Sequence, residues 1–199
     1  MVKLAEIRNS TAHYLTQPAA KLLAKTPVTP DSLTWSGFLL SLLAGALIIT
    51  GNLFVAGFVV LIAGFFDMLD GALARLINRT TRFGAVLDST LDRIAEGVIL
   101  LSLLVLYAQE QSVLGSLLVG ITLLGSFLVS YVRARAEALG IECKAGLFTR
   151  PERVIILALG LLFSRIDYAL IITLAVIAAL SFFTAIQRLI YAWQRTRAE

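Results

Sequence analysis

The stretch from residue 32 to residue 66 reads SLTWSGFLLSLLAGALIITGNLFVAGFVVLIAGFF and contains no charged side chain. As a single helix it would be about 52 Å long, at 1.5 Å per residue. A helix needs only about 20 apolar residues to cross a membrane, so this stretch is long enough for two. Gly51 and Asn52 are typical turn residues and divide it into helices over about 32–50 and 53–77. The stretch therefore predicts a hairpin of two transmembrane helices.

The composition extends this prediction to the whole chain. The 199 residues are 58% hydrophobic and 15% charged, with a mean hydropathy of +0.87, whereas roughly a quarter of the residues in a soluble domain are charged. Further apolar stretches predict helices over about 84–108, 113–139, 151–164 and 168–193. We therefore expect an all-α integral membrane protein with six transmembrane helices, in a single membrane domain over residues 1–199.

The segment over residues 2–25 differs from these apolar stretches. It mixes leucine, isoleucine and tyrosine with basic side chains and is too polar to cross the bilayer. Such a composition predicts a juxtamembrane amphipathic helix that lies at the membrane surface.

The basic residues predict the orientation. With six transmembrane helices, both termini and the second and fourth connections lie on one side, and of the 17 Lys and Arg residues only Arg165 falls on the other. The positive-inside tendency makes the basic side cytoplasmic, at the inner membrane of the cell. Because these residues follow the membrane topology, we expect membrane lipids as partners and no nucleic acid, despite the net charge of +4.

Four aspartates interrupt the apolar pattern: Asp67, Asp70, Asp88 and Asp92. On each of two successive helices a pair of them is separated by three or four residues and shares one face. A charged side chain in a membrane helix costs about 2.5–3.5 kcal/mol, and clustered carboxylates need cations between them. Oxygen ligands favour hard divalent ions such as Mg²⁺, Mn²⁺ or Ca²⁺ over zinc. The pattern therefore predicts a metal site between two facing helices, at their cytoplasmic ends.

Two other interpretations of these acids stay open at this point. Asp88 or Asp92 could form ion pairs with Arg75 or Arg93, which would make them structural polar contacts. Alternatively, the acids could belong to a cation or proton transporter, because transporters place carboxylates within membrane helices. Transporters are typically built from internal repeats, and we see no convincing repeat in this chain.

The pattern Asp67-x₂-Asp70-Gly71-x₂-Ala74-Arg75-x₈-Gly84-x₃-Asp88-x₃-Asp92 resembles the signature of the CDP-alcohol phosphatidyltransferases at every defined position. The resemblance implies an enzyme that transfers a phosphatidyl group from a CDP-lipid to an alcohol and releases CMP. It also implies a homodimer and two bound ions, Mg²⁺ or Mn²⁺.

The resemblance further implies roles for individual residues. Asp67, Asp70, Asp88 and Asp92 would bind the metal, and Asp92 would also act as the general base on the acceptor hydroxyl. CDP would be bound by Thr34, Asp67, Gly71, Ala74, Arg75 and Gly84. For Arg75 a contact with an aspartate is the alternative. Glu96, one turn after Asp92, could pair with Arg93 or support a ligand.

A second group of residues concerns the acceptor alcohol. Arg133, Arg135, Arg150, Arg153 and Arg188 lie near the expected cytoplasmic helix ends, where they could bind a phosphate dianion or contact lipid headgroups. The segments 130–137 (SYVRARAE) and 150–153 (RPER) resemble the branch of the family that uses inositol 1-phosphate, although Arg133 stands where that branch has lysine. This implies inositol 1-phosphate as the acceptor and phosphatidylinositol phosphate, or its archaeal ether counterpart, as the product. Glycerol 3-phosphate, the acceptor of a phosphatidylglycerol-phosphate synthase, is the alternative.

Overall fold

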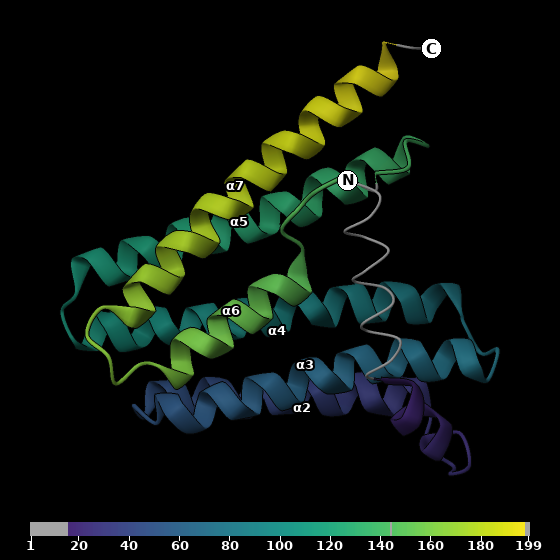
Figure 1. The fold of residues 1–199 in the computed structure, drawn as a ribbon, viewed down its shortest axis with the longest axis horizontal. Helices are drawn as coiled ribbons and strands as arrows, with labels where there is room; N and C mark the ends of the chain where they lie inside the picture. Colours follow the sequence, from purple (N-terminus) through teal and green to yellow (C-terminus); the bar gives the residue numbers. More distant parts are fainter. Residues whose placement is uncertain (1–15, 144, 198–199) are drawn as a thin grey trace.

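The computed structural model describes residues 16–143 and 145–197, which fold into a bundle of helices with no strand in this described part (Figure 1). The helices are α2 (Pro30–Ile49), α3 (Leu53–Leu76), α4 (Arg82–Gln109), α5 (Val113–Ala138), α6 (Arg150–Leu162) and α7 (Ala169–Thr196). The predicted all-α fold is confirmed, and each helix end lies within a few residues of the prediction.

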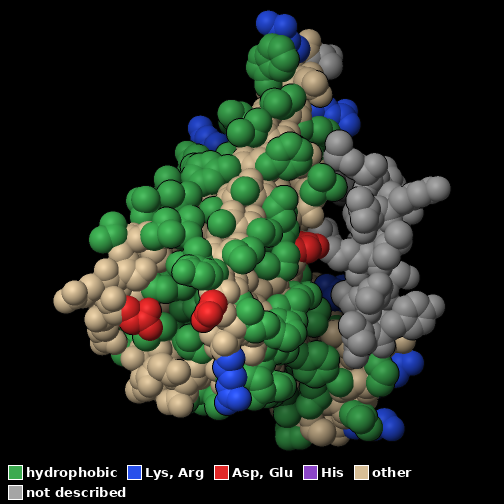
Figure 2. Space-filling view, turned by 60° about the vertical axis from the view of Figure 1, so that its left-hand side comes forward, with side chains coloured by type: hydrophobic (Ala, Val, Ile, Leu, Met, Phe, Trp, Pro, Cys, Tyr) green, Lys and Arg blue, Asp and Glu red, His purple; other side chains and the backbone are tan. Residues whose placement is uncertain are grey.

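Four of the described helices, α2, α3, α5 and α7, are long and apolar enough to cross a membrane. The face seen in Figure 2 is covered mostly by hydrophobic side chains, which suits contact with lipid tails. The chain is thus a multi-pass membrane protein. The remaining two helices do not meet the same criteria, because the first half of α4 carries several charges and α6 has only 13 residues. The number of six transmembrane helices therefore stays a prediction.

The helices pack in a continuous series around α2, α3 and α4. Helix α2 packs against both α3 and α4, α3 packs against α6, α4 against α5, and α7 against both α5 and α6. Small residues allow close approach: a Cβ atom at Gly57 would lie 3.0 Å from the carbonyl oxygen of Ala158, where α3 meets α6. Helices α3 and α4 are not among the closely packed pairs of the described residues, and the end of α3 and the start of α4 border the cavities described below.

The larger hydrophobic core lies in the half of the bundle away from the aspartates, where α2, α4 and α6 end and α3 and α7 begin. Ile48, Leu103, Leu161 and Leu174 are fully buried there and join α2, α4, α6 and α7. A smaller cluster of Leu33, Leu69 and Leu73 packs near the start of α2 and the end of α3.

Residues 16–23 are helical, and Ala19 and Leu23 of this segment pack on the smaller cluster. This segment is the described part of the predicted surface helix over 2–25. Residues 1–15 lie outside the described residues, so the amphipathic helix as a whole stays a prediction.

Candidate metal and substrate site

Three aspartates meet in the space between α3 and α4. Asp67, Asp70 and Asp88 each offer one carboxylate oxygen, and these three oxygens lie within 4.8 Å of one another. Asp70 is buried, whereas Asp67 and Asp88 are half-buried and remain accessible. A set of carboxylate oxygens at this spacing suits a hard divalent cation such as Mg²⁺ or Mn²⁺. The residues present therefore fit the metal that the sequence predicts.

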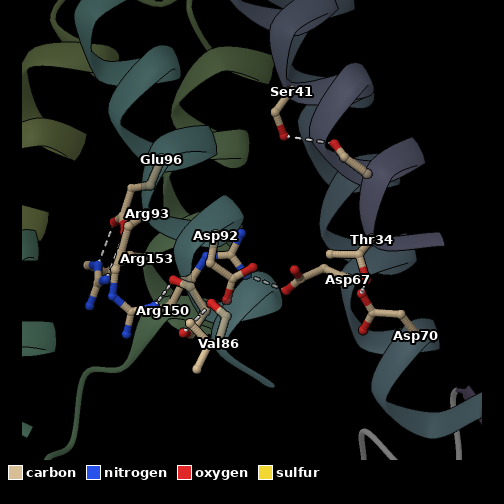
Figure 3. A network of polar contacts seen from close by, with 12 residues as sticks. Thr34, Ser41, Asp67, Asp70, Val86, Asp92, Arg93, Glu96, Arg150 and Arg153 are labelled. Carbon is tan, nitrogen blue, oxygen red and sulfur yellow. Dashed lines mark hydrogen bonds and ion pairs between the residues drawn. The ribbon is translucent and has the colours of Figure 1, made fainter. Parts of the chain in front are cut away.

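Thr34 fixes the buried carboxylate of this group. Its hydroxyl donates a hydrogen bond of 2.6 Å to Oδ2 of Asp70, and it also lies 3.2 Å from the carbonyl oxygen of Pro30 (Figure 3). Helix α2 starts just before this point, with Pro30 in its first turn and Thr29 as its N-cap. Thr34, which the sequence assigned to CDP, thus also orients Asp70.

Asp92 lies outside the group of three and faces an arginine instead. The Nη1 atom of Arg150 bonds to Oδ2 of Asp67 and lies 2.8 Å from Oδ1 of Asp92 (Figure 3). Arg150 reaches this position because α6 begins with it, behind a capping box formed by Thr149 and Glu152. The structure therefore pairs Asp92 with Arg150, rather than with Arg75 or Arg93 as the structural interpretation of the sequence considered.

A cavity of about 170 Å³ opens on one side of the three aspartates. It is lined by the predicted CDP-binding residues Thr34, Gly71, Ala74, Arg75 and Gly84, together with Asp70 and Asp88. Among the described residues, a Cβ atom at Gly71 would meet the Arg75 guanidinium alone, at 3.4 Å, so the glycine leaves the cavity wall open. The remaining predicted CDP-binding residue, Asp67, does not line this cavity.

Several residues of this cavity were not predicted. Asp31 lines it from the start of α2, and Arg79, Thr80 and Thr81 line it from the connection before α4. The latter three lie in the eight-residue spacer of the signature, where the pattern specifies no residue. The sequence offered a cue for these three, because basic and hydroxyl side chains are typical contacts of phosphate groups.

A larger cavity, of about 610 Å³, opens on the other side. Asp67, Asp88 and Asp92 form its acidic edge, and its basic lining comes from Arg93, Arg133, Arg150, Arg153 and Arg188. The structure thus brings four of the five predicted acceptor arginines to one cavity. The fifth, Arg135, is exposed and lines neither cavity. Asp88 lines both, so the two cavities meet at the aspartates.

The arginines of the larger cavity are held in different ways. Arg133 is exposed and pairs with Glu137 at 2.8 Å, within α5. Arg188 is buried and donates to two carbonyl oxygens, that of Val129 at 2.7 Å and that of Ala145 at 2.9 Å. Arg188 therefore has a fixed position in the cavity wall, whereas Arg133 is accessible to solvent.

The contacts of Glu96 answer the question left open by the sequence. Glu96 pairs with Arg153, while Arg93 bonds to the carbonyl oxygen of Ser89 in its own helix. The first of the two alternatives for Glu96, a pair with Arg93, is therefore wrong.

The acidic cluster, which fits a divalent metal, thus lies between a cavity lined by the signature residues and a cavity lined by arginines. Divalent ions and arginines are groups with which proteins bind phosphates. The profile of the CDP-alcohol phosphatidyltransferase family matches residues 27–193. The chain therefore belongs to the CDP-alcohol phosphatidyltransferases.

Individual relatives agree with this assignment. The archaetidylinositol phosphate synthase of Methanothermobacter thermautotrophicus is 43% identical over 170 residues, which cover 84% of each chain. The phosphatidylinositol phosphate synthase of Mycobacteroides abscessus is 41% identical over 189 residues, which cover 92% of this chain and 86% of the relative.

Solved structures show the same fold. The phosphatidylinositol phosphate synthase of Mycobacterium tuberculosis with CDP-DAG bound is similar with a TM-score of 0.80 and 38% identity, over 90% of this chain and 94% of that chain. The same enzyme in complex with manganese and citrate is similar with a TM-score of 0.80 over 89% of this chain.

Proposed function

We propose that this chain transfers the phosphatidyl group of a CDP-lipid, or its archaeal ether counterpart, to the hydroxyl of inositol 1-phosphate and releases CMP. The observation that carries this proposal is the pair of cavities that meet at Asp88, one lined by the signature residues and the other by arginines. The names of the relatives support it, because they include archaetidylinositol and phosphatidylinositol phosphate synthases.

The proposed cofactor is a pair of Mg²⁺ or Mn²⁺ ions held by Asp67, Asp70 and Asp88, with Asp92 as a further ligand. The three grouped carboxylates support this set, and the relative from M. tuberculosis was solved with manganese. When bound, the ions would bind the diphosphate of the CDP-lipid and stabilise the negative charge that develops on the departing CMP. Thr34 would keep Asp70 in the orientation that this binding requires.

The CDP moiety would occupy the smaller cavity. There Gly71, Ala74 and Gly84 leave room for close approach to the backbone, and the Arg75 guanidinium supplies a positive charge for a phosphate. Asp67 lines the larger cavity and not this one, so it would contact CDP only through the metal.

The acceptor would occupy the larger cavity, with its phosphate among Arg133, Arg150, Arg153 and Arg188. Asp92 lines the same cavity, so an acceptor hydroxyl there is within reach of its carboxylate, which would take the proton as the general base. Arg150 contributes both to the surroundings of the base and to the phosphate site. Its guanidinium pairs with Asp92 in this structure and would turn toward the phosphate when the acceptor binds. For Arg135 the exposed position favours a contact with lipid headgroups instead.

The proposed topology has six transmembrane helices, with both termini and the site at the cytoplasmic side of the inner membrane. Helices α4 and α6 support this number, because both pack within the bundle between helices that are apolar enough to span. The proposed domain is a single one over residues 1–199, and the profile match over 27–193 supports it. We further propose a homodimer, which the mass of the purified protein in detergent would test.

The decisive assay offers the purified protein a CDP-lipid with Mg²⁺ or Mn²⁺ and, in parallel, inositol 1-phosphate, glycerol 3-phosphate or serine. We expect CMP release to be fastest, at equal acceptor concentration, with inositol 1-phosphate. Equal use of glycerol 3-phosphate would contradict the assignment of the acceptor and favour a phosphatidylglycerol-phosphate synthase. Cation flux into liposomes without any CMP release would favour the transporter.

A further inference from the structure

Glu96 and Arg153 form a buried ion pair beside the larger cavity, one helical turn beyond Asp92. The Nε atom of Arg153 donates to Oε1 of Glu96 at 2.7 Å, and Nη2 donates to Oε2 at 2.9 Å (Figure 3). The two side chains come from α4 and α6, and they are only 7% and 2% exposed. A parallel, bidentate contact of this kind fixes the plane of the guanidinium as well as its position.

The pair does not satisfy the whole guanidinium. Its Nη1 atom is buried and has no hydrogen-bond partner among residues 16–143 and 145–197. A buried donor without a partner is unfavourable, and a charged one more so. Arg153 lines the cavity of about 610 Å³ as well as a small one of about 20 Å³, and of these two the larger has room for a phosphate.

Stability alone is a poor explanation for this arrangement. A buried ion pair is often no more stable than apolar side chains of similar volume, because both charges must be removed from water. Ile99, Leu157 and Ile177 line a small cavity beside the pair, together with the hydroxyl side chains of Thr122 and Ser126. A guanidinium held in one plane suits the recognition of phosphate.

We propose that Glu96 is a positioning residue for the acceptor. It holds Arg153 by Nε and Nη2 and leaves Nη1 for the phosphate of the acceptor. This inference rests on the proposed function. It gives a role in acceptor binding to Glu96, which lies outside the signature pattern. Glu96 acts on the acceptor through Arg153, to which it is bonded, so its removal affects acceptor binding and leaves the CDP-lipid and the general base in place.

The test compares E96Q with the wild type in the CMP-release assay, with separate titrations of the two substrates. Glutamine keeps the size of the side chain but replaces one acceptor oxygen by an amide nitrogen, so the bidentate contact is lost. We expect the KM for inositol 1-phosphate to rise roughly 10- to 100-fold, and kcat and the KM for the CDP-lipid to stay within about twofold. E110Q is the matched control, because Glu110 is an exposed carboxylate at the C-terminal end of the same helix and lines neither substrate cavity. It should change either KM by less than about twofold.

A double-mutant comparison shows whether Glu96 works through Arg153. If it does, E96Q should raise the acceptor KM no further in the R153M background. Losses that multiply in the double variant would overturn the inference, as would an E96Q enzyme with a lowered melting temperature and an unchanged acceptor KM. E96D keeps the buried charge but is one methylene shorter. It should fold even where E96Q does not, and it should also raise the acceptor KM, whereas a wild-type KM in a folded E96D would count against the positioning role.

The same variants separate this inference from the proposed function. If the wild type releases no CMP with any acceptor, the proposed function fails. Calorimetric titration of the wild type and E96Q with inositol 1-phosphate then tests Glu96 alone. Weaker binding by E96Q would support the positioning role, and equal binding would overturn it.

Discussion

Replacement of Thr34 by valine would test how the buried metal ligand is oriented. The hydroxyl of Thr34 donates to Oδ2 of Asp70 at 2.6 Å, and both side chains are buried, with Thr34 9% and Asp70 4% exposed. Valine has nearly the same shape as threonine and removes only the donor. The variant therefore isolates one hydrogen bond to a carboxylate of the acidic cluster.

The size of the effect follows from this contact. A hydrogen bond to a charged group contributes about 1.5–3 kcal/mol, and loss of a partner that orients a metal ligand weakens metal binding roughly 10- to 100-fold. We expect the Kd for Mn²⁺, measured by electron paramagnetic resonance of the free ion, to rise by a factor in this range. The same variant should retain its helical content, because the change creates no cavity.

Ser41→Ala serves as the control for this measurement. Ser41 is also buried on α2, but its hydroxyl donates to the carbonyl oxygen of Gly37 in the same helix, at 3.0 Å. Its removal should change the Kd for Mn²⁺ by less than about twofold. A Thr34→Val protein that binds Mn²⁺ as tightly as the wild type would refute the idea that Thr34 orients Asp70 for the metal.

Three further predictions concern the base, the arginine beside it and the packing of α3. Asp92→Asn should lower kcat for CMP release at least about 100-fold while Mn²⁺ still binds; undiminished turnover would contradict the assignment of Asp92 as the base. The Arg150→Met variant should have a lower Kd for Mn²⁺, because Asp67 loses its ion pair with Arg150, and a higher KM for the acceptor. A wild-type Kd together with a wild-type KM would show that Arg150 affects neither the metal site nor the acceptor. Gly57→Val should lower the melting temperature, since overpacking typically costs about 1–3 kcal/mol and its Cβ would lie 3.0 Å from the oxygen of Ala158; an unchanged melting temperature would show that α3 and α6 can move apart there.

Much of the fold could be predicted because long apolar stretches and their breaks carry a strong signal. The turn at Gly51 and Asn52, for example, separates α2 from α3 where the composition indicated. The spacing of the four aspartates likewise predicted that their carboxylates meet, and those of Asp67, Asp70 and Asp88 do so, whereas Asp92 lies outside this group. These features depend on local periodicity, which the sequence displays directly.

The partners of individual charged side chains could not be predicted in the same way. Glu96 lies three residues from Arg93 but pairs with Arg153, which is 57 residues away. Arg150 contacts Asp67 across 83 residues. Such contacts depend on how α6 packs against α3 and near α4, and no local pattern encodes that arrangement.

The division into two cavities, which we propose for the two substrates, also emerges only in three dimensions. The resemblance grouped Asp67 with the CDP-binding residues, whereas in the structure Asp67 lines the larger, arginine-rich cavity. It also grouped Arg135 with the other arginines, although a spacing of two residues puts Arg133 and Arg135 on nearly opposite faces of α5, and only Arg133 lines the cavity.

The most direct test of the metal site is anomalous diffraction at the manganese edge, from crystals grown with Mn²⁺ and a CDP-lipid. We expect anomalous peaks within coordination distance of the carboxylates of Asp67, Asp70 and Asp88, with the diphosphate of the lipid on the side of Gly71 and Arg75. Manganese bound elsewhere, or a diphosphate seated among Arg153 and Arg188 with no ion at the three aspartates, would contradict the proposed division of the site.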